Sequence, residues 1–159
     1  MHIKMTPNEL NLFTEQLIQD AAFGLGLLAI ILLLNVFFSI RIFIGFRNAC
    51  SRSVKVSQFH LVSRFMIAVL LICVAQVLSI HLWAAAIYAL GLIESFMLAV
   101  LFTGSCYTTL GIYSDTLPIG WRTVAFYIAF SGLFSFAMAT SAMISMLGII
   151  AKKIDTSAK

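Results

Sequence analysis

The sequence predicts an all-α membrane protein, and two observations carry this prediction. Hydrophobic residues make up 62% of the 159 residues, whereas ten side chains are Lys or Arg and six are Asp or Glu. Three intervals, 21–40, 65–93 and 123–151, contain none of these four charged residue types. A helix needs about 20 apolar residues to cross a bilayer. Each interval is therefore long enough for one transmembrane helix.

The part of the chain before the first apolar interval, residues 1–20, is polar and more acidic than basic. It lacks the basic start of a cleaved signal peptide, so we expect a retained extracytoplasmic N-terminal segment. The interval that follows predicts a peripheral transmembrane helix over 21–46, in which Asn35 hydrogen-bonds to a neighbouring helix. A basic cytoplasmic linker is expected at 47–60, and a short cytoplasmic tail at 152–159.

A fourth uncharged interval, 95–114, either crosses the membrane or re-enters it, and the distribution of Lys and Arg favours re-entry. Cytoplasmic loops collect these residues. Residues 41–64 carry five, 152–159 carry three, 1–20 carry one, and Arg122 is the tenth. Re-entry places eight of the ten on one side, whereas a full span places six there. We therefore expect an outer N-terminus, a cytoplasmic C-terminus and a re-entrant helix.

The local composition of this interval agrees with re-entry. Glu94 favours the positive N-terminal end of a helix over roughly 95–107, and about 13 residues at ~1.5 Å each give only about 20 Å. Small and hydroxyl-bearing residues then dilute the apolar pattern: Gly104, Ser105, Thr108, Thr109 and Gly111. Backbone that is not helical at this depth must be buried in protein or line a water-filled cavity. A pore would satisfy that condition.

Four features occur in a fixed order along residues 81–147: Trp83, then Thr108-Thr109-Leu110-Gly111, then Asp115, then Trp121-Arg122. They resemble the pore module of the potassium channel superfamily, in particular small bacterial ion channels without a voltage sensor. In that family an outer helix ends near a tryptophan, a pore helix leads into the filter Thr-Thr-Leu-Gly-Tyr-Gly-Asp, and a Trp-Arg pair opens the inner helix.

This resemblance implies a fold and a function. Residues 61–151 would form a pore module of outer helix, pore helix, filter loop and inner helix, assembled as a four-fold homotetramer in the bacterial inner membrane. It implies passive conduction of K⁺ or Na⁺ and requires no cofactor. The partners are further copies of the chain and a lipid bilayer with anionic head groups; nucleic acid is not expected. The resemblance assigns ion binding to the filter loop: Thr108, Thr109, Leu110, Gly111, Ile112, Tyr113 and Ser114.

The filter departs from the family pattern after its first glycine. Between Gly111 and Asp115 the family has Tyr-Gly, but this chain has Ile112, Tyr113 and Ser114. A filter needs alternating left- and right-handed residues, and glycine takes the left-handed positions without steric penalty. Another residue there costs about 1–2 kcal/mol per chain. We therefore expect reduced discrimination between K⁺ and Na⁺.

Charged and aromatic residues flank the loop. Asp115, Arg122 and Glu94 are candidates for the outer mouth, where repeated carboxylates would concentrate cations; Asp115 could also be an ordinary loop residue. Arg122 either pairs with Asp115 or Glu94 or extends to the membrane interface. Trp83 and Trp121 are expected to anchor helices at that interface.

The last apolar interval carries a stripe of residues at helical spacing. The family places a hinge at Gly132 and suggests an inner cavity lined by Phe136, Ala139, Thr140 and Met143. Such a stripe can equally pack against other helices.

Other classes of function remain open. The chain carries no catalytic constellation, so we do not expect an enzyme. A small secondary transporter with Glu94 or Asp115 as its coupling carboxylate is one alternative, and a non-conducting channel-like membrane scaffold is the other. Thr108 and Thr109 would then only hydrogen-bond between packed helices.

Overall fold

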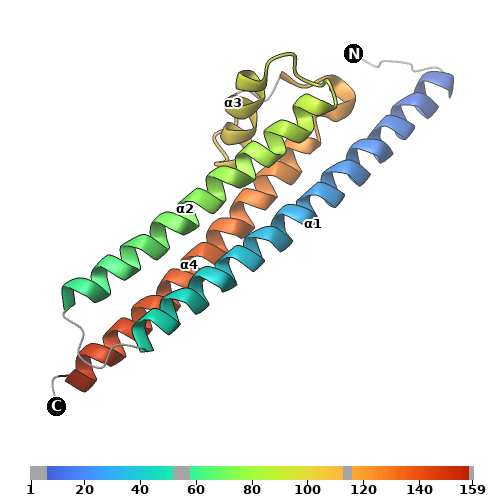
Figure 1. Ribbon diagram of the computed structural model, residues 1–159. Helices are drawn as coiled ribbons and strands as arrows, with labels where there is room; N and C mark the ends of the chain where they lie inside the picture. Colours follow the sequence, from blue (N-terminus) through green and yellow to red (C-terminus); the bar gives the residue numbers. More distant parts are fainter. Residues whose placement is uncertain (1–6, 52–57, 113–115, 158–159) are drawn as a thin grey trace. The chain divides into compact units, whose positions relative to one another are not determined.

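The structure is a computed structural model that describes residues 7–51, 58–112 and 116–157. Four α-helices follow one another along the chain: α1 (Pro7–Ser51), α2 (Gln58–Ala89), α3 (Phe96–Tyr107) and α4 (Val124–Ser157); a short 3-10 turn, η2 (Ile119–Trp121), precedes α4 (Figure 1). Three stretches are long and apolar enough to cross a membrane: Ile18–Ser51, Phe59–Ala89 and Val124–Asp155. The prediction of an all-helical chain with three such helices is confirmed.

The helices are longer than the sequence predicted. α1 begins at Pro7 instead of residue 21 and ends at Ser51 instead of 46, so helix occupies part of the predicted segment 1–20 and of the predicted linker 47–60. α4 continues through most of the predicted tail 152–159. The helices extend beyond the uncharged intervals because missing charge marks the hydrocarbon-embedded part of a helix, not its ends. Pro7 fits a first helical turn, and residues 8–20 contain no Gly or Pro that would interrupt it.

The chain forms two compact units. The first unit comprises Met1–Ile31 and Ile80–Leu133, and thus holds all of α3 and the loop that follows it. The second unit comprises Leu32–Ser79 and Phe134–Lys159. Each of the three long helices contributes a segment to both units.

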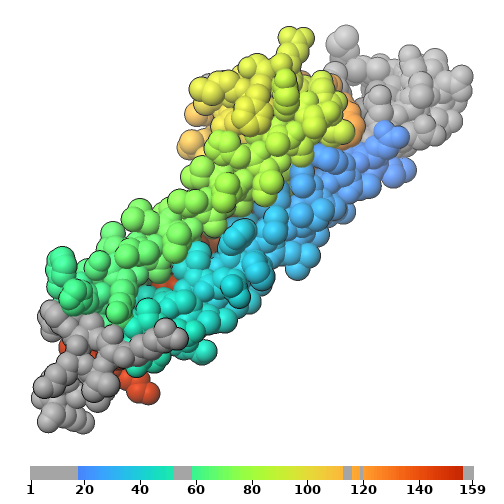
Figure 2. All heavy atoms as spheres, in the orientation of Figure 1, coloured from blue at the N-terminus to red at the C-terminus, as the bar shows by residue number. Residues whose placement is uncertain are grey.

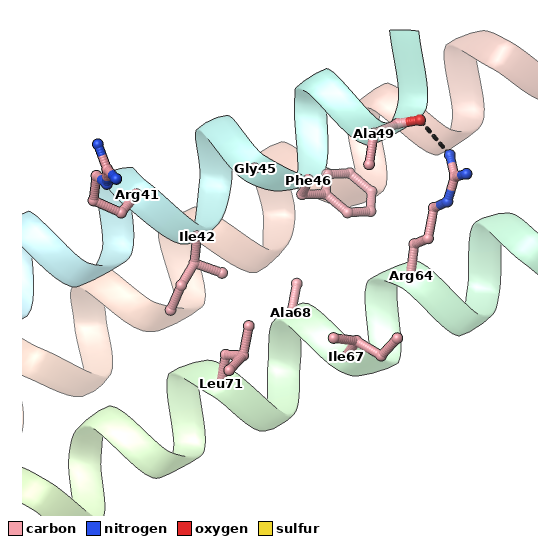
Figure 3. Close-up of a pocket in the computed structure, with 9 residues that line it drawn as sticks. All are labelled: Arg41, Ile42, Gly45, Phe46, Ala49, Arg64, Ile67, Ala68 and Leu71. Atoms are coloured by element: carbon pink, nitrogen blue, oxygen red, sulfur yellow. Dashed lines mark hydrogen bonds between the residues drawn. The ribbon is translucent and has the colours of Figure 1, made fainter. Parts of the chain in front are cut away.

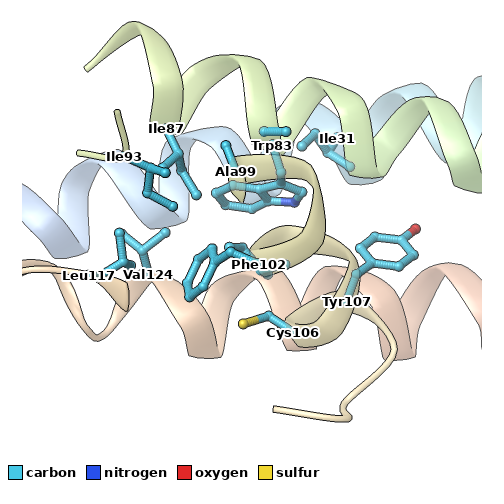
Figure 4. Packing of buried hydrophobic residues seen from close by; sticks show 12 residues of the cluster. Ile31, Trp83, Ile87, Ile93, Ala99, Phe102, Cys106, Tyr107, Leu117 and Val124 are labelled. Atoms are coloured by element: carbon cyan, nitrogen blue, oxygen red, sulfur yellow. The ribbon is translucent and has the colours of Figure 1, made fainter. Parts of the chain in front are cut away.

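The core of the first unit lies where α3 packs on the C-terminal part of α2 and the N-terminal part of α4 (Figures 1 and 4). Figure 2 shows the outer surface of α3 against that of the C-terminal part of α2. The side chain of Trp83 is fully buried in this core, and its indole N–H donates a hydrogen bond to Ser131 Oγ at 2.9 Å. Trp83 is therefore a core residue, and the prediction that it anchors a helix at the membrane interface was wrong for this chain. Trp121 is half-buried and meets Phe23 of α1 edge to face, with ring centroids 5.9 Å apart.

The second unit combines an apolar core with buried hydrogen bonds between helices. Its buried apolar residues are Phe46, Cys50, Leu61, Ala68, Ile72, Ala139 and Met146. The amide Nδ2 of Asn35 in α1 donates to Ser79 Oγ in α2 at 2.8 Å, which confirms the predicted link between helices. Gln76 Nε2 donates to the carbonyl oxygen of Ser135 in α4 at 3.4 Å. Polar pairs of this kind bind membrane helices together because hydrocarbon offers them no other partner.

Two cationic side chains from neighbouring helices donate hydrogen bonds to carbonyl groups at the C-terminal end of α1. The last carbonyls of a helix have no partner within the helix and carry partial negative charge, and α1 has no basic residue in its own last turn. The guanidinium of Arg64 in α2 donates to the carbonyl of Ala49, and the ammonium of Lys153 in α4 donates to the carbonyl of Cys50. These contacts tie the three helices of the second unit together.

Candidate functional site

α3 packs one buried face against the other helices of the first unit. Its buried residues are Ala99, Phe102, Thr103, Ser105, Cys106 and Tyr107. Figure 4 shows Ala99 and Phe102 next to Trp83 of α2, with Cys106 and Tyr107 following along the same helix toward its end. The hydroxyl of Thr103 lies 2.8 Å from the carbonyl oxygen of Ala99 and 3.3 Å from that of Ile80 in α2. The bond to Ile80 links the middle of α3 to α2.

Gly132 allows α4 to pass directly beneath the last residue of α3. A Cβ atom built at Gly132 would lie 2.0 Å from the carbonyl oxygen of Tyr107 and 2.9 Å from its carbonyl carbon. Those atoms are backbone and cannot rotate away, so only glycine permits this approach. Tyr107 itself is fully buried. The structure therefore gives Gly132 a packing role within a continuous α4, and the hinge stays a prediction.

α3 ends in a Schellman motif, which fixes the backbone of the first candidate filter residues. The N–H of Leu110 donates to the carbonyl of Ser105 at 2.8 Å, and the N–H of Thr109 donates to that of Cys106 at 2.9 Å. This pair of hydrogen bonds requires a left-handed residue directly after the helix cap. That residue is Thr109, with φ of 62°.

A threonine in this conformation is unusual, as the end of α2 illustrates. α2 closes with the same two hydrogen bonds, from Leu92 to Ile87 at 3.2 Å and from Gly91 to Tyr88 at 2.9 Å. There the left-handed residue is Gly91, with φ of 68°. A β-branched residue in the left-handed region is an outlier and is strained by about 1–2 kcal/mol. Such strain concentrates at functional sites, which singles out Thr109 in this loop.

The loop after α3 alternates in backbone handedness over three residues. Thr109 and Gly111 have φ of 62° and 65°, whereas Leu110 between them is not left-handed. Five candidate filter residues lie in the described part of the loop, and all are exposed: Thr108, Thr109, Leu110, Gly111 and Ile112. Leu110 is 68% and Ile112 is 69% exposed. The remaining candidates, Tyr113 and Ser114, and the mouth residue Asp115 lie outside the described residues.

The two threonine hydroxyls of the loop bond to nearby backbone. Thr108 Oγ1 donates to the carbonyl of Gly104 and Thr109 Oγ1 donates to that of Thr108, both at 2.7 Å. A hydroxyl that donates its proton still offers two lone pairs as an acceptor. The exposed loop therefore presents oxygen atoms of the type that bind hard cations.

Two of the candidate residues for the outer mouth are described, and both are exposed. Glu94 lies two residues before α3, and Arg122 lies between η2 and α4. Their predicted pairing with each other or with Asp115 stays a prediction.

The candidate cavity residues on α4 divide between surface and core. Phe136 and Thr140 are exposed, and the Thr140 hydroxyl donates to the carbonyl of Phe136 at 2.9 Å. Ala139 is buried in the core of the second unit, and Met143 packs against that core. Ala139 and Met143 therefore follow the packing alternative, because their side chains are already in contact with other helices. Only Phe136 and Thr140 remain available to face a cavity.

The sequence reasoning missed a buried carboxylate in α1. Asp20 is fully buried in the first unit, where its Oδ2 accepts a hydrogen bond from the hydroxyl of Thr123, just before α4. Its Oδ1 has no hydrogen-bond partner among the residues that the structure describes. The available signal was its position at the edge of the uncharged interval 21–40, since ionisable residues at a membrane span are expensive to bury and mark functional sites.

In the described ranges, no group of three or more His, Cys, Asp or Glu side chains could hold a metal ion. Comparison with known proteins finds no matching family model, no matching curated protein and no matching solved structure.

Proposed function

We propose that four copies of this chain surround one axis and form a passive channel for monovalent cations, with reduced discrimination between K⁺ and Na⁺. The observation that carries the proposal is the end of α3. The short, packed helix α3 is followed by an exposed loop whose backbone alternates in handedness at Thr109, Leu110 and Gly111. Rings of backbone carbonyls from such loops can replace the hydration shell of a cation.

The length of α3 supports re-entry into the membrane. Its 12 residues span about 18 Å at 1.5 Å per residue, which is well short of the roughly 30 Å hydrocarbon core. A helix this short, flanked by two long apolar helices, fits a segment that enters and leaves on the same side. With three full spans, the eight-to-two distribution of Lys and Arg supports an N-terminus outside and a C-terminus in the cytoplasm.

The strain at Thr109 supports a role for its side chain in ion binding. Glycine would close the same Schellman motif without strain, as Gly91 does at the end of α2. Threonine instead places a hydroxyl oxygen beside the carbonyls of the loop, at the negative C-terminal end of α3, where a cation is favoured. The inner part of the filter is then formed by Thr109, Leu110 and Gly111, and the three residues after Gly111 weaken selectivity.

Two measurements, made one after the other, test the proposal. The mass of the detergent-solubilised particle should correspond to four chains, and reconstituted liposomes should pass K⁺ and Na⁺ with a permeability ratio below about 10, equivalent to less than ~1.4 kcal/mol of discrimination. Replacing Ile112-Tyr113-Ser114 by Tyr-Gly should raise the ratio. A dimer or monomer as the only species contradicts the assembly, and a tetramer without flux would instead indicate a scaffold.

A pair of matched variants isolates the Thr109 hydroxyl. Thr109→Ala should reduce conductance, because it removes an oxygen from the proposed inner site. Ser145→Ala in α4 is the control, since Ser145 also donates to a backbone carbonyl, that of Ser141 at 2.9 Å, but lies far along the chain from the loop. Equal conductance of both variants would count against an ion-binding role for Thr109.

Asp20 favours a secondary transporter as the second candidate function. Asp20 is a buried carboxylate with one oxygen that has no hydrogen-bond partner in the described ranges, and buried carboxylates are the type of group that carries a proton through a membrane protein. It replaces Glu94 as the stronger candidate for a coupling carboxylate, because Glu94 is exposed. Transport of this kind predicts saturable flux that depends on a proton gradient and disappears in Asp20→Asn. Electrodiffusive flux without saturation in that assay supports the channel.

A further inference from the structure

Side chains of α2 hydrogen-bond to a neighbouring helix in each unit. In the second unit, Arg64 donates to the carbonyl of Ala49 at the end of α1 (Figure 3). In the first unit, the indole N–H of Trp83 donates to Ser131 Oγ in α4 at 2.9 Å. Ser131 directly precedes the glycine at which α4 passes beneath the end of α3. The bond in the first unit is therefore placed to act on the loop that follows α3.

The Trp83–Ser131 bond is well defined because both partners are enclosed and each has one hydrogen-bonding role. Both side chains are fully buried. The Ser131 hydroxyl donates its own proton to the carbonyl of Ile128 at 2.7 Å, so toward the indole it acts as an acceptor, and an indole N–H can only donate. Breaking the bond leaves a buried N–H without a partner, which is unfavourable. The position of Ser131 is thus tied to α2.

The next residue of α4 connects this position to the end of α3. A Cβ atom built at Gly132 would lie 2.0 Å from the carbonyl oxygen of Tyr107. Successive residues of a helix point about 100° apart, so one turn of α4 contacts α2 through Ser131 and the end of α3 through Gly132. A rotation or shift of α4 that separates Ser131 from Trp83 therefore also moves the backbone against which Tyr107 rests.

Trp83 also contacts α3 directly. Its side chain lies next to Ala99 and Phe102 in the core of the first unit (Figure 4). Tryptophan suits this position because its ring provides a large packing surface while its N–H forms a hydrogen bond. One side chain of α2 thus packs against the buried face of α3 and holds α4.

The strained backbone of the loop requires such support. Thr109, two residues after Tyr107, has φ of 62°, and a strained conformation of this kind persists only where the surrounding structure imposes it. The N–H groups of Leu110 and Gly111 both donate to the carbonyl of Ser105, at 2.8 and 3.1 Å. These two bonds close the loop only while the end of α3 stays in place.

We propose that Trp83 and Ser131 are positioning residues for the ion-binding loop. Their hydrogen bond fixes α4 against the end of α3, and through Gly132 and the Tyr107 carbonyl it holds Thr109 in its left-handed conformation. The placement of the loop carbonyls, and with it the discrimination between cations, depends on this bond. The effect on ions rests on the proposed channel function, whereas the effect on the loop does not.

Hydrogen–deuterium exchange of the full chain in lipid nanodiscs, resolved to single amides, tests the effect on the loop. Ser131→Ala removes the acceptor and should raise the exchange rates of the Leu110 and Gly111 amides about fivefold, the change that loss of one neutral hydrogen bond supplies. Ser135→Ala is the matched control. Ser135 lies four residues further along α4 and is also buried, but its hydroxyl has no hydrogen-bond partner in the described ranges. It should leave both rates unchanged.

Two comparisons separate positioning from a general loss of stability. The amides of Gly91 and Leu92 close α2 with hydrogen bonds of the same type, and their exchange should not respond to Ser131→Ala. Trp83→Phe removes the donor of the same bond and should accelerate exchange at the same two loop amides. Unchanged loop amides in Ser131→Ala, or an equal acceleration at Gly91 and Leu92, would overturn the proposal.

Reversal potentials under bi-ionic conditions test the effect on ions. They do not depend on how many channels are folded, so a loss of stability alone does not shift them. Ser131→Ala should change the ratio of K⁺ to Na⁺ permeability by at least about twofold, because part of the free energy of one hydrogen bond reaches the ion site. Ser135→Ala should keep the wild-type ratio.

The two experiments distinguish failure of this inference from failure of the channel. An unchanged permeability ratio in Ser131→Ala, together with accelerated loop exchange, would overturn the role in ion discrimination. Wild-type liposomes without flux would refute the proposed function and the effect on ions with it. The exchange rates would then still decide whether Trp83 and Ser131 position the loop.

Discussion

Replacing Gly132 by alanine should force α4 away from the end of α3. The new Cβ atom would lie 2.0 Å from the carbonyl oxygen of Tyr107, 2.9 Å from its carbonyl carbon and 3.2 Å from its Cα. Even favourable C–H···O contacts have carbon–oxygen distances of about 3.3–3.6 Å. The two backbones must therefore separate by roughly 1 Å, because no side-chain rotation can relieve contacts with main-chain atoms.

The expected magnitude is the difference between two opposing effects. An added methyl group in a closely packed site costs about 1–3 kcal/mol, whereas alanine in place of glycine inside a helix stabilises by roughly 0.5–1 kcal/mol. Gly132→Ala should thus lower the free energy of unfolding by up to about 2.5 kcal/mol. Gly148→Ala in the same helix meets nothing within 4 Å, so it should show only the stabilising effect. The difference in the free energy of unfolding between the two variants, about 1–3 kcal/mol, is the cost of adding a methyl group at the close contact between α4 and Tyr107.

Unfolding in mixed micelles of increasing SDS content, followed by the fluorescence of Trp83 and Trp121, gives both free energies. Flux through the same variants reconstituted in liposomes adds a second readout, because a displaced Tyr107 also displaces Thr109, two residues further along the loop. If Gly132→Ala is as stable as Gly148→Ala, the packing argument is refuted. If it keeps its stability and changes only channel opening, Gly132 acts as a hinge.

Three further changes probe other contacts. Thr109→Gly should raise the free energy of unfolding by about 1 kcal/mol, because glycine adopts the left-handed conformation without strain, and it should lower conductance. An unchanged free energy of unfolding in the same SDS titration would show that Thr109 is not strained. A double-mutant cycle of Asn35→Leu and Ser79→Ala should give a coupling free energy of about 0.6 kcal/mol, the average for hydrogen-bonded pairs in a membrane protein. A coupling free energy of zero would show that the 2.8 Å hydrogen bond between the two side chains does not stabilise the protein. Thr123→Val should lower the free energy of unfolding by about 1–3 kcal/mol, because it removes the hydroxyl that donates a hydrogen bond to the buried Asp20. Thr123→Ser keeps the hydroxyl, so its thermal unfolding should be close to that of the wild type.

The sequence by itself determined the class of protein and the number of long apolar helices. Uninterrupted apolar intervals are a strong signal because hydrocarbon excludes charge and requires every backbone group to be paired within a helix. The same reasoning located the short helix that became α3, since Glu94 precedes it and small polar residues follow it. The polar Asn35 in an otherwise apolar interval was likewise sufficient to predict a bond between helices, because such a group seeks a partner in the membrane.

Only the tertiary structure decided which apolar residues face other helices. In a membrane protein the faces toward lipid and toward neighbouring helices are both apolar, so hydrophobic periodicity does not separate them. For this reason Trp83 was expected at the interface and is enclosed in the core. For Ala139 the sequence left a cavity and packing both open, and it packs inside the second unit. The left-handed Thr109 and the close approach at Gly132 depend on where α3 ends against α4. That placement arises from contacts between residues distant in sequence, which local composition does not encode.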